Sequence, residues 1–257
     1  MPDELLTRLR RFSTEAFPRY QDRFRDLVEQ GQHPSTLFIG CSDSRLVPHL
    51  LTGAGPGELF LVRNVAAFVP PWDGTLEAAP AGCGCAACGA GGGQGHWVGH
   101  HGTAAAIEYA VLALEVRHVI VCGHSHCGGI RALYGELPPE AQNLRAWLDL
   151  GREAVLPVQP GPEALRRTEE RSVVLQLERL MGYPMVRSRV EQGRLSLHGW
   201  HYVIEDGEVN VFDVHQGRFV PASEAEHSGT GPYRDLGQGD EGGQLFNEIA
   251  DAWPPRG

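Results

Sequence analysis

The apolar positions of this chain repeat with two different periods, which predict alternating strands and helices. Short apolar runs predict buried strands at residues 36–39, 58–62 and 118–122. Longer stretches, in which apolar residues recur every three or four positions, predict helices at 104–114, 128–134, 140–153, 163–181 and 184–192. Strands that alternate with helices favour a mostly parallel β-sheet covered by helices on both faces.

The two ends of the chain follow other patterns. Residues 1–34 carry apolar residues at helical spacing among many charged ones, which predicts an N-terminal helical arm. Apolar runs at 200–204 and 209–214 flank Glu205-Asp206-Gly207, a sequence typical of a turn, and predict a C-terminal antiparallel hairpin. The expected fold is therefore α/β, a mostly parallel central sheet flanked by helices, with the arm and the hairpin added to it.

We expect one domain over residues 1–257, because no change in composition marks a second one. Residues 74–101 form a Gly- and Cys-rich insertion without periodicity, and residues 222–257 form a Gly-rich tail. Both are predicted to be loops.

Composition narrows the class of protein. The net charge of −10 argues against binding to nucleic acid or to an anionic membrane. No apolar run reaches the roughly 20 residues of a membrane span, and the N-terminus lacks the pattern of a secretory signal. We therefore expect a cytoplasmic protein whose six cysteines are thiols or metal ligands rather than a disulfide framework.

One group of reactive side chains directly follows the first predicted strand. Cys41, Asp43 and Arg45 occupy alternating positions, and alternate residues of an extended segment point to the same side. We expect the three side chains to face one site. The ends of parallel strands are where ligands bind in sheets of this kind.

A second group follows the strand at 118–122. His124 and Cys127 lie three positions apart at a strand-to-helix turn, and with Cys41 they supply two thiolates and one imidazole. This set leaves a fourth position open, as in catalytic zinc sites, and its sulfur ligands favour zinc over magnesium or calcium. His126 is an alternative to His124, although its position next to Cys127 makes joint binding awkward.

The predicted chemistry follows from this ligand set. Zinc lowers the pKa of a bound water toward about 7, so that hydroxide forms near neutral pH. Asp43 is placed to accept a hydrogen bond from that hydroxide, and Arg45 can grip Asp43 and keep it ionised. In the alternative arrangement, Asp43 binds the zinc itself and closes the site.

At these residues the chain closely resembles the β-class carbonic anhydrases. The matching stretches are Cys41-Ser42-Asp43-Ser44-Arg45, Arg63-Asn64-Val65-Ala66, Ala105 to Val111, Cys122 to Gly129 and Leu195 to Trp200. The resemblance implies Zn²⁺ bound by Cys41, His124 and Cys127, with Asp43 and Arg45 as the catalytic dyad. It also implies reversible hydration of CO₂ to bicarbonate and a proton, by a homodimer or a higher even homo-oligomer.

The resemblance is closer to the plant-like branch of that family. It implies a CO₂ pocket lined by residues matching Gln32, Phe60, Val65 and Tyr109. Another branch has an inhibitory bicarbonate pocket built from Trp, Arg and Tyr, and the matching residues here are Phe38, Arg63 and Tyr202. Because the Trp is missing, we expect an open site in which Asp43 pairs with Arg45.

The insertion is the main departure from the family pattern. Its cysteines and histidines have spacings compatible with a second metal or redox site: Cys83, Cys85, Cys88, His96, His100 and His101. The alternatives are a loop whose thiols are incidental, and a lid or partner contact.

Two other functions compete with CO₂ hydration. Hydrolysis of carbonyl sulfide or carbon disulfide would use the same scaffold and the same ligands. A non-catalytic zinc protein or a thiol sensor would belong to a different class. The presence of Asp43, Arg45, Gln32 and Tyr109 argues against loss of catalysis, because a purely structural zinc site does not need them.

Overall fold

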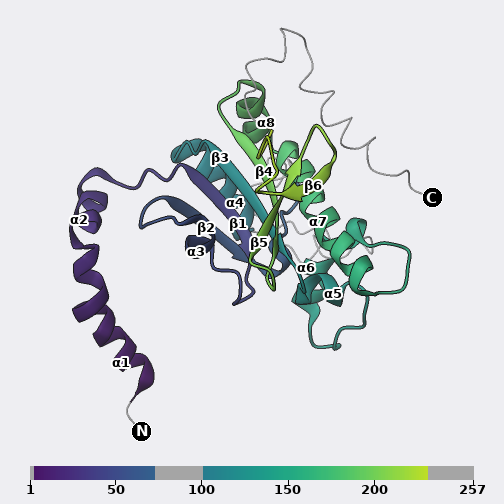
Figure 1. The fold of residues 1–257 in the computed structure, drawn as a ribbon, viewed down its shortest axis with the longest axis horizontal. Helices are drawn as coiled ribbons and strands as arrows, with labels where there is room; N and C mark the ends of the chain where they lie inside the picture. The colour runs from purple at the N-terminus through teal and green to yellow at the C-terminus, as the bar shows by residue number, and fades with distance from the viewer. Residues whose placement is uncertain (1–2, 73–100, 231–257) are drawn as a thin grey trace, which may run out of the picture.

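A computed structural model describes residues 3–72 and 101–230, and its centre is one β-sheet (Figure 1). Within these ranges the strands are β1 (Thr36–Cys41), β2 (Leu59–Asn64), β3 (His118–His124), β4 (Ser196–Val203), β5 (Glu208–Asp213) and β6 (Arg218–Pro221). Their order in the sheet is β2-β1-β3-β4-β5-β6.

The pairing of the strands confirms the expected fold class. Strand β1 pairs in parallel with both β2 and β3, and β3 pairs in parallel with β4. Strands β4 and β5 form the predicted antiparallel hairpin, and β6 adds a further antiparallel strand at the edge. The sequence did not predict β6, because four residues ending in Pro221 are too few to show a clear alternation.

Helices cover the sheet and lead into it. Those of the described ranges are α1 (Glu4–Arg11), α2 (Gln21–Gln30), α3 (Pro48–Thr52), α4 (Gly102–Glu108), α5 (Gly128–Ala132), α6 (Gln142–Asp149), α7 (Pro162–Gly182) and α8 (Pro184–Glu191). Shorter helical turns are η1 (Phe12–Ala16), η2 (Phe17–Arg19), η3 (Val65–Ala67), η6 (Tyr109–Ala113) and η7 (Arg152–Ala154). The predicted helices at 104–114 and 140–153 are thus each divided in two.

Alternate residues of the strands build two hydrophobic cores on opposite faces. Leu37 and Ile39 of β1 belong to the core that includes side chains of α4, α7 and α8. Phe38, between them, belongs to the core on the other face, where residues of α5 and α6 pack. This is the alternation expected of a strand buried on both sides, and it fixes the register of the sheet.

Helix α7 lies close against the middle of the sheet. A Cβ atom at Gly199 of β4 would lie 3.0 Å from Leu177 Cδ1 and from Val173 Cγ1. The helix therefore approaches the strand closely at this glycine, where no side chain stands between them. This close packing brings polar residues of α7 near the carboxyl ends of β1 and β3.

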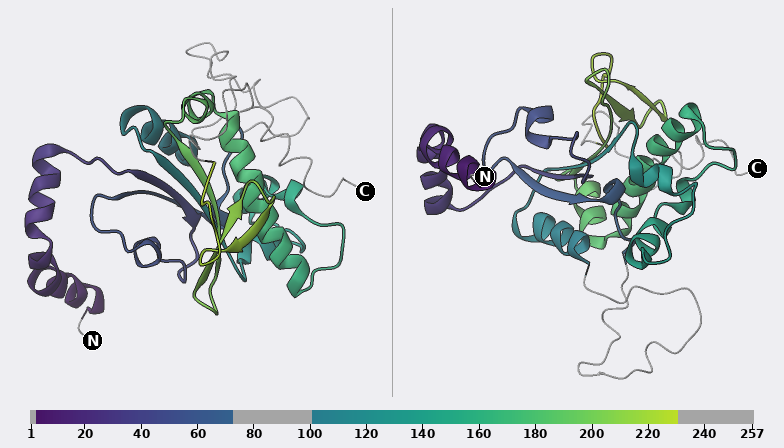
Figure 2. Two further views of the ribbon diagram at one scale, coloured as in Figure 1. Left: turned by 45° about the horizontal axis from the view of Figure 1, so that its top comes forward. Right: turned by 90° about the horizontal axis from the view of Figure 1, so that it is seen from below.

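The N-terminal arm extends from the rest of the molecule (Figures 1 and 2). Asp3 caps α1 by accepting hydrogen bonds from the backbone N–H groups of Leu5 and Leu6. Pro18, within η2, separates α1 from α2, as the sequence indicated. The apolar side chains of the first turns are exposed in a single chain, with Leu9 63% and Phe12 50% accessible.

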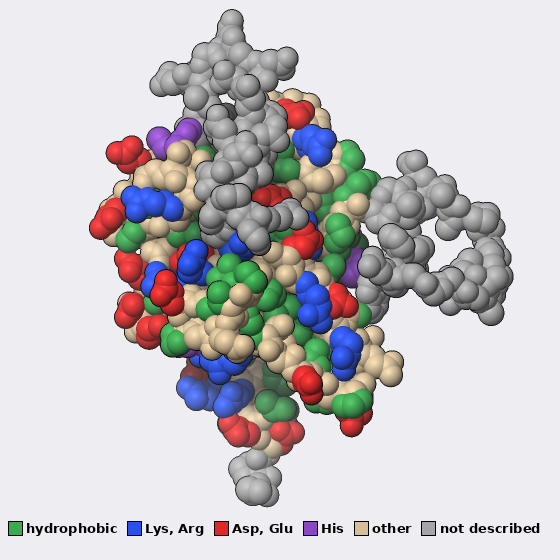
Figure 3. Space-filling view, turned by 90° about the vertical axis from the view of Figure 1, so that its right-hand side faces the viewer, with side chains coloured by type: hydrophobic (Ala, Val, Ile, Leu, Met, Phe, Trp, Pro, Cys, Tyr) green, Lys and Arg blue, Asp and Glu red, His purple; other side chains and the backbone are tan. Residues whose placement is uncertain are grey.

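The surface carries charges of both signs. On the face shown in Figure 3, acidic and basic side chains both occur around an apolar area near the middle. Among the described residues, no helix combines the length and the apolar character that crossing a membrane requires.

Two histidines at the end of the sheet away from the predicted site are linked by a hydrogen bond. His118 Nδ1 lies 3.1 Å from His198 Nε2, and the His198 ring also bonds the carbonyl oxygen of Ser228. Burial lowers the pKa of both imidazoles, and the guanidinium of Arg117 further lowers the pKa of His118. As the pH falls, both histidines therefore stay neutral longer in the folded chain than in the unfolded chain.

We expect Leu177→Ala to lower the free energy of unfolding by about 2–5 kcal/mol, because Leu177 is buried between α7 and the sheet. Urea denaturation followed by circular dichroism measures this change. Val158→Ala, at an exposed residue, is the control and should change the stability by less than about 0.5 kcal/mol. Equal effects of the two changes would contradict the packing described.

We expect His118 and His198 to lower the stability of the metal-free chain as the pH drops below about 6.5, the pKa of an exposed histidine. In that range these two side chains bind protons in the unfolded chain but stay neutral in the folded chain, so acid favours unfolding through them. The change His198→Gln removes one of the two titrating groups and should make the free energy of unfolding less dependent on pH. Urea midpoints measured between about pH 5 and pH 8 test this, and identical slopes for both proteins would refute it.

Candidate metal centre

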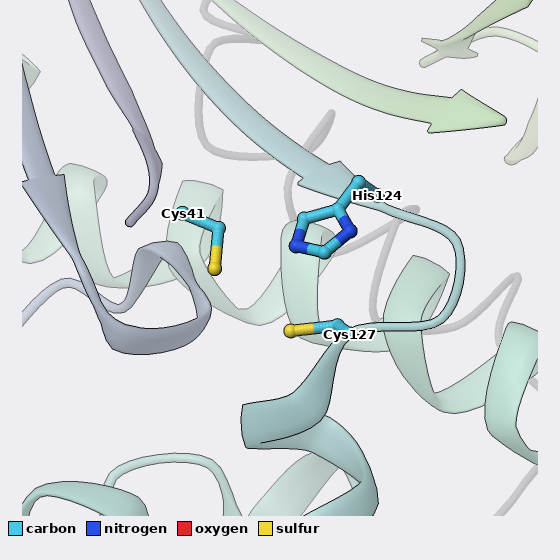
Figure 4. A group of neighbouring side chains, drawn as sticks. All are labelled: Cys41, His124 and Cys127. Carbon is cyan, nitrogen blue, oxygen red and sulfur yellow. The ribbon is translucent and has the colours of Figure 1, made fainter. Parts of the chain in front are cut away.

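Three potential metal ligands meet where two neighbouring strands end. Cys41 is the last residue of β1, His124 is the last residue of β3, and Cys127 directly precedes α5. The two sulfur atoms and a ring nitrogen all lie within 4.8 Å of one another, and all three residues are buried. Figure 4 shows the three side chains pointing into the same space. Within residues 3–72 and 101–230, no other group of three or more His, Cys, Asp or Glu side chains is placed to hold a metal ion.

The orientation of His124 suits a metal ligand. Its Nδ1 donates a hydrogen bond to the carbonyl oxygen of Ser125 at 2.8 Å, which leaves the lone pair on Nε2. Nε2 is buried and has no hydrogen-bond partner in the described part of the chain. A buried nitrogen without a partner, next to two thiols, is what a metal ion would satisfy.

The two thiols also favour a bound cation. The hydrogen bond between the side chains of Cys127 and Cys41 lowers the pKa of Cys41 to about 4, against the opposing effect of burial. The same bond, with burial, raises the pKa of Cys127 well above its usual value. Without a metal, Cys41 is therefore the thiol that ionises first, and Cys127 keeps its proton. A metal ion would displace the proton of Cys127 and bind both thiolates.

Asp43 and Arg45 form a bidentate ion pair beside the ligands. Arg45 Nε donates to Asp43 Oδ1 at 2.9 Å, and Arg45 Nη2 donates to Asp43 Oδ2 at 2.8 Å. These hydrogen bonds hold the pKa of Asp43 well below its usual range. Asp43 Oδ2 lies 3.9 Å from His124 Nε2, so an ionised carboxylate borders the space between the ligands.

The backbone geometry that we expected for this stretch was wrong. Strand β1 ends at Cys41, and the next residues turn instead of continuing as an extended segment. Leu46 donates its backbone N–H to the carbonyl of Asp43, and Arg45 donates its own to Asp43 Oδ1. An aspartate that binds the backbone two residues on favours a turn over a strand. The side chains meet because of this turn, not because of strand alternation.

His126 does not join the metal ligands. Its backbone lies in the left-handed region with φ 56°, and its ring points to Glu205, with Nε2 3.1 Å from Oε1. The other carboxyl oxygen of Glu205 accepts a hydrogen bond from Ser125 Oγ at 2.7 Å. Glu205, in the β4–β5 turn, therefore fastens the loop that carries the ligands. Of the two candidate histidines, His124 is the one that lies with the cysteines.

Two further polar residues support the ligand loops, and the sequence did not single them out for this. Arg63 of β2 donates two hydrogen bonds to the carbonyl of Cys41 and one, of 2.6 Å, to the carbonyl of Asp43. Glu169 of α7 accepts the backbone N–H of Cys127 at 3.0 Å. The second of these belongs to a row of polar residues at helical spacing on the buried face of α7: Glu169, Ser172 and Gln176.

The four predicted pocket residues are not gathered around the small cavity beside the ligands. Phe60 and Tyr109 pack together, with ring centroids 5.7 Å apart. Val65 accepts a hydrogen bond at its carbonyl from Trp147 Nε1, and its side chain is partly exposed. Gln32 is exposed between α2 and β1. None of the four lines the small cavity between the ligands, and the pocket stays a prediction.

The second metal or redox site also stays a prediction. Cys83, Cys85, Cys88, His96 and His100 lie outside the described residues. His101 lies inside them, just before α4, with its ring centroid 6.0 Å from that of Trp147.

Comparison with known proteins identifies the family. The family model for carbonic anhydrase matches residues 36–209. A solved structure of the β-carbonic anhydrase CcaA superposes with a TM-score of 0.73 and 33% identity, over 90% of this chain and 95% of that one. The chain belongs to the β-carbonic anhydrase family. This confirms the resemblance noted from the sequence motifs.

Similarity to other carbonic anhydrases supports the assignment to this enzyme family. The carbonic anhydrase of Synechococcus elongatus is 39% identical over 80% of this chain and 70% of its own length. That of Pseudomonas aeruginosa is 37% identical over 84% of this chain and 89% of its own. Tetrameric β-carbonic anhydrases from Sordaria macrospora superpose with a TM-score of 0.62 at 26% identity, over 80% of this chain and 94% of the matched one.

The choice between the two histidines can be tested directly. We expect the protein to bind zinc at the group in Figure 4 and His124→Ala to lose most of it, because one of three ligands is gone. His126→Ala should keep its zinc, because His126 is exposed and paired with Glu205. Zinc per chain is measured after dialysis against a weak chelator. If His126→Ala lost its zinc while His124→Ala kept it, the assignment would be contradicted.

Proposed function

We propose that the chain is a zinc enzyme that catalyses the reversible hydration of CO₂ to bicarbonate and a proton. The observation that carries this proposal is the buried group of Cys41, His124 and Cys127 beside the ion pair of Asp43 and Arg45. A bound zinc ion would supply Lewis acidity, which lowers the pKa of a water so that a strong nucleophile is present near neutral pH.

The residues of the chain would then prepare that nucleophile. Asp43 is an acceptor because Arg45 keeps it ionised, and one of its oxygens borders the ligand group. It can hold the proton of the nucleophile in a hydrogen bond and so direct a lone pair toward the substrate. Arg45 also donates to the carbonyl of His126 at 3.2 Å, so it ties the two ligand loops together while it orients Asp43.

Arg63 is expected to keep Asp43 in the position that catalysis needs. Its hydrogen bonds hold the carbonyls of Cys41 and Asp43, on either side of the point where the chain turns. A metal ligand and the acceptor are thereby fixed relative to one another. This hydrogen bonding, rather than a bicarbonate pocket, is the role that we propose for Arg63.

For CO₂ itself we propose the pocket implied by the family resemblance. Phe60, Val65 and Tyr109 would give it apolar walls, and Gln32 would bind an oxygen of bicarbonate. Tyr109 is 49% exposed in the single chain, and Val65 is 37% exposed. Another subunit would therefore be needed to enclose these residues.

We propose that the enzyme is a homodimer or a higher even homo-oligomer. The arm exposes Leu5, Leu9 and Phe12, and β2 at the edge of the sheet exposes Leu61. Apolar side chains gathered on an extended arm are typical of a surface that a partner covers. Tetrameric relatives in Sordaria macrospora support this proposal. Cytoplasmic location stays a prediction from the sequence.

Stopped-flow assays of CO₂ hydration test the function. We expect the zinc-loaded enzyme to be active and Asp43→Ala to lower kcat/KM by about 10²–10⁴-fold, because the proton acceptor is removed. Asp206→Ala, which removes an exposed carboxylate from the β4–β5 turn, is the control and should keep full activity.

Three other outcomes would contradict CO₂ hydration or favour another function. Activity of the wild-type enzyme no greater than that of Asp43→Ala would reject CO₂ hydration. Turnover of carbonyl sulfide or carbon disulfide without hydration of CO₂ would favour the hydrolase. Zinc binding without either activity would indicate a non-catalytic zinc protein.

A further inference from the structure

Two buried polar side chains behind the ligand group have no part in the chemistry proposed above. Glu169 of α7 is 4% exposed and His201 of β4 is fully buried. Glu169 Oε2 lies 3.2 Å from His201 Nε2, while Glu169 Oε1 accepts the backbone N–H of Cys127. A chain of contacts thus runs from the middle of the sheet, through a carboxyl group, to the backbone of a metal ligand.

Burial of these two groups has to be explained. A carboxyl and an imidazole removed from water destabilise a fold unless partners replace the lost hydrogen bonds. Apolar side chains of similar volume would fill the same space, often with equal or greater stability. Stability alone therefore does not account for a Glu and a His at this place.

The backbone of Cys127 is the part of the metal site that Glu169 and His201 can hold in place. Cys127 precedes α5, and the backbone N–H groups of Ile130 and Gly129 at the start of that helix lower the pKa of its thiol, against the larger opposing effects. Its own N–H donates to Glu169. Without an acceptor at that point, the N–H would be buried and unpaired, and the short turn from His124 to Cys127 would be free to shift.

We propose that Glu169 is a positioning residue that fixes Cys127 for the metal, and that His201 fixes Glu169. The proposal rests on the metal site of the proposed function and adds residues to it. Glu169 acts as a hydrogen-bond acceptor from α7, which is packed against β3 and β4 and so provides a rigid support. Residues outside the ligand shell that orient ligands in this way commonly raise metal affinity by about 10–100-fold.

Replacing both members of the pair separates positioning from stability. In the full-length protein, we expect Glu169→Met combined with His201→Leu to fold with an unchanged or higher urea midpoint when metal-free. Its zinc affinity, measured by competition with a chelator, should fall by about 10–100-fold. Glu170→Met, the same change at the next residue of α7, is the control, because Glu170 pairs with Arg166 instead.

The conservative variant gives a second readout. Glu169→Gln keeps an oxygen that can accept the N–H of Cys127, so it should retain wild-type zinc affinity. Its cobalt-substituted form should also keep the wild-type thiolate-to-cobalt absorption bands, whereas those of the double variant should shift. Unchanged affinity and unchanged bands in a folded double variant would overturn the proposal, as would a loss of affinity in Glu169→Gln equal to that of the double variant.

A single variant decides the matter if the double variant does not fold. His201→Leu leaves Glu169 in place without its partner, so zinc affinity should fall several-fold, and unchanged affinity would overturn the proposal. Failure of the proposed function is a separate result. A wild-type chain that binds zinc but hydrates no CO₂ would reject the function, while the affinities would still decide the role of Glu169.

Discussion

The candidate site depends on the parallel pairing of β1 with β3. In a parallel pair, the carboxyl ends of both strands lie at the same edge of the sheet, so residues that follow them meet without further arrangement. The register aligns Gly40 with Cys122, which brings Cys41 next to the stretch that ends at His124. Any other pairing of these strands would separate the thiol from the imidazole.

The loops that follow the strands need more than this pairing, because loops alone do not hold side chains to within fractions of an ångström. Hydrogen bonds from outside each loop supply that restraint. Arg63 holds the first loop, Glu205 and Glu169 hold the second, and Arg45 of the first loop bonds the carbonyl of His126 in the second. These residues come from β2, the first loop itself, the β4–β5 turn and α7. The site is therefore held by parts of the chain that are far apart in sequence.

The sequence was sufficient to predict the parallel strands, the hairpin, the flanking helices and the group of two cysteines and a histidine, because these depend on periodicity and on distinctive residue types. It was insufficient where the outcome depends on contacts between distant segments. The turn after Cys41 follows from the hydrogen bond of Asp43 to the backbone of Arg45, which competes with strand alternation. The spacing of Glu169 with Ser172 and Gln176 shows that the three share a face of their helix, but its contact with Cys127 follows only from how the helix lies on the sheet.

The aromatic contacts of Trp72 and His101 link these two residues to opposite faces of the sheet. The ring of Trp72 packs on Tyr183, which belongs to the core shared with α7 and α8, and the ring of His101 packs on Trp147, which packs against the core on the side of α5 and α6. Neighbours in the packing of one core need not be neighbours in the other. A substitution at Trp72 would therefore be felt first around α7 and α8, and one at His101 first around α6, on the other side of the sheet.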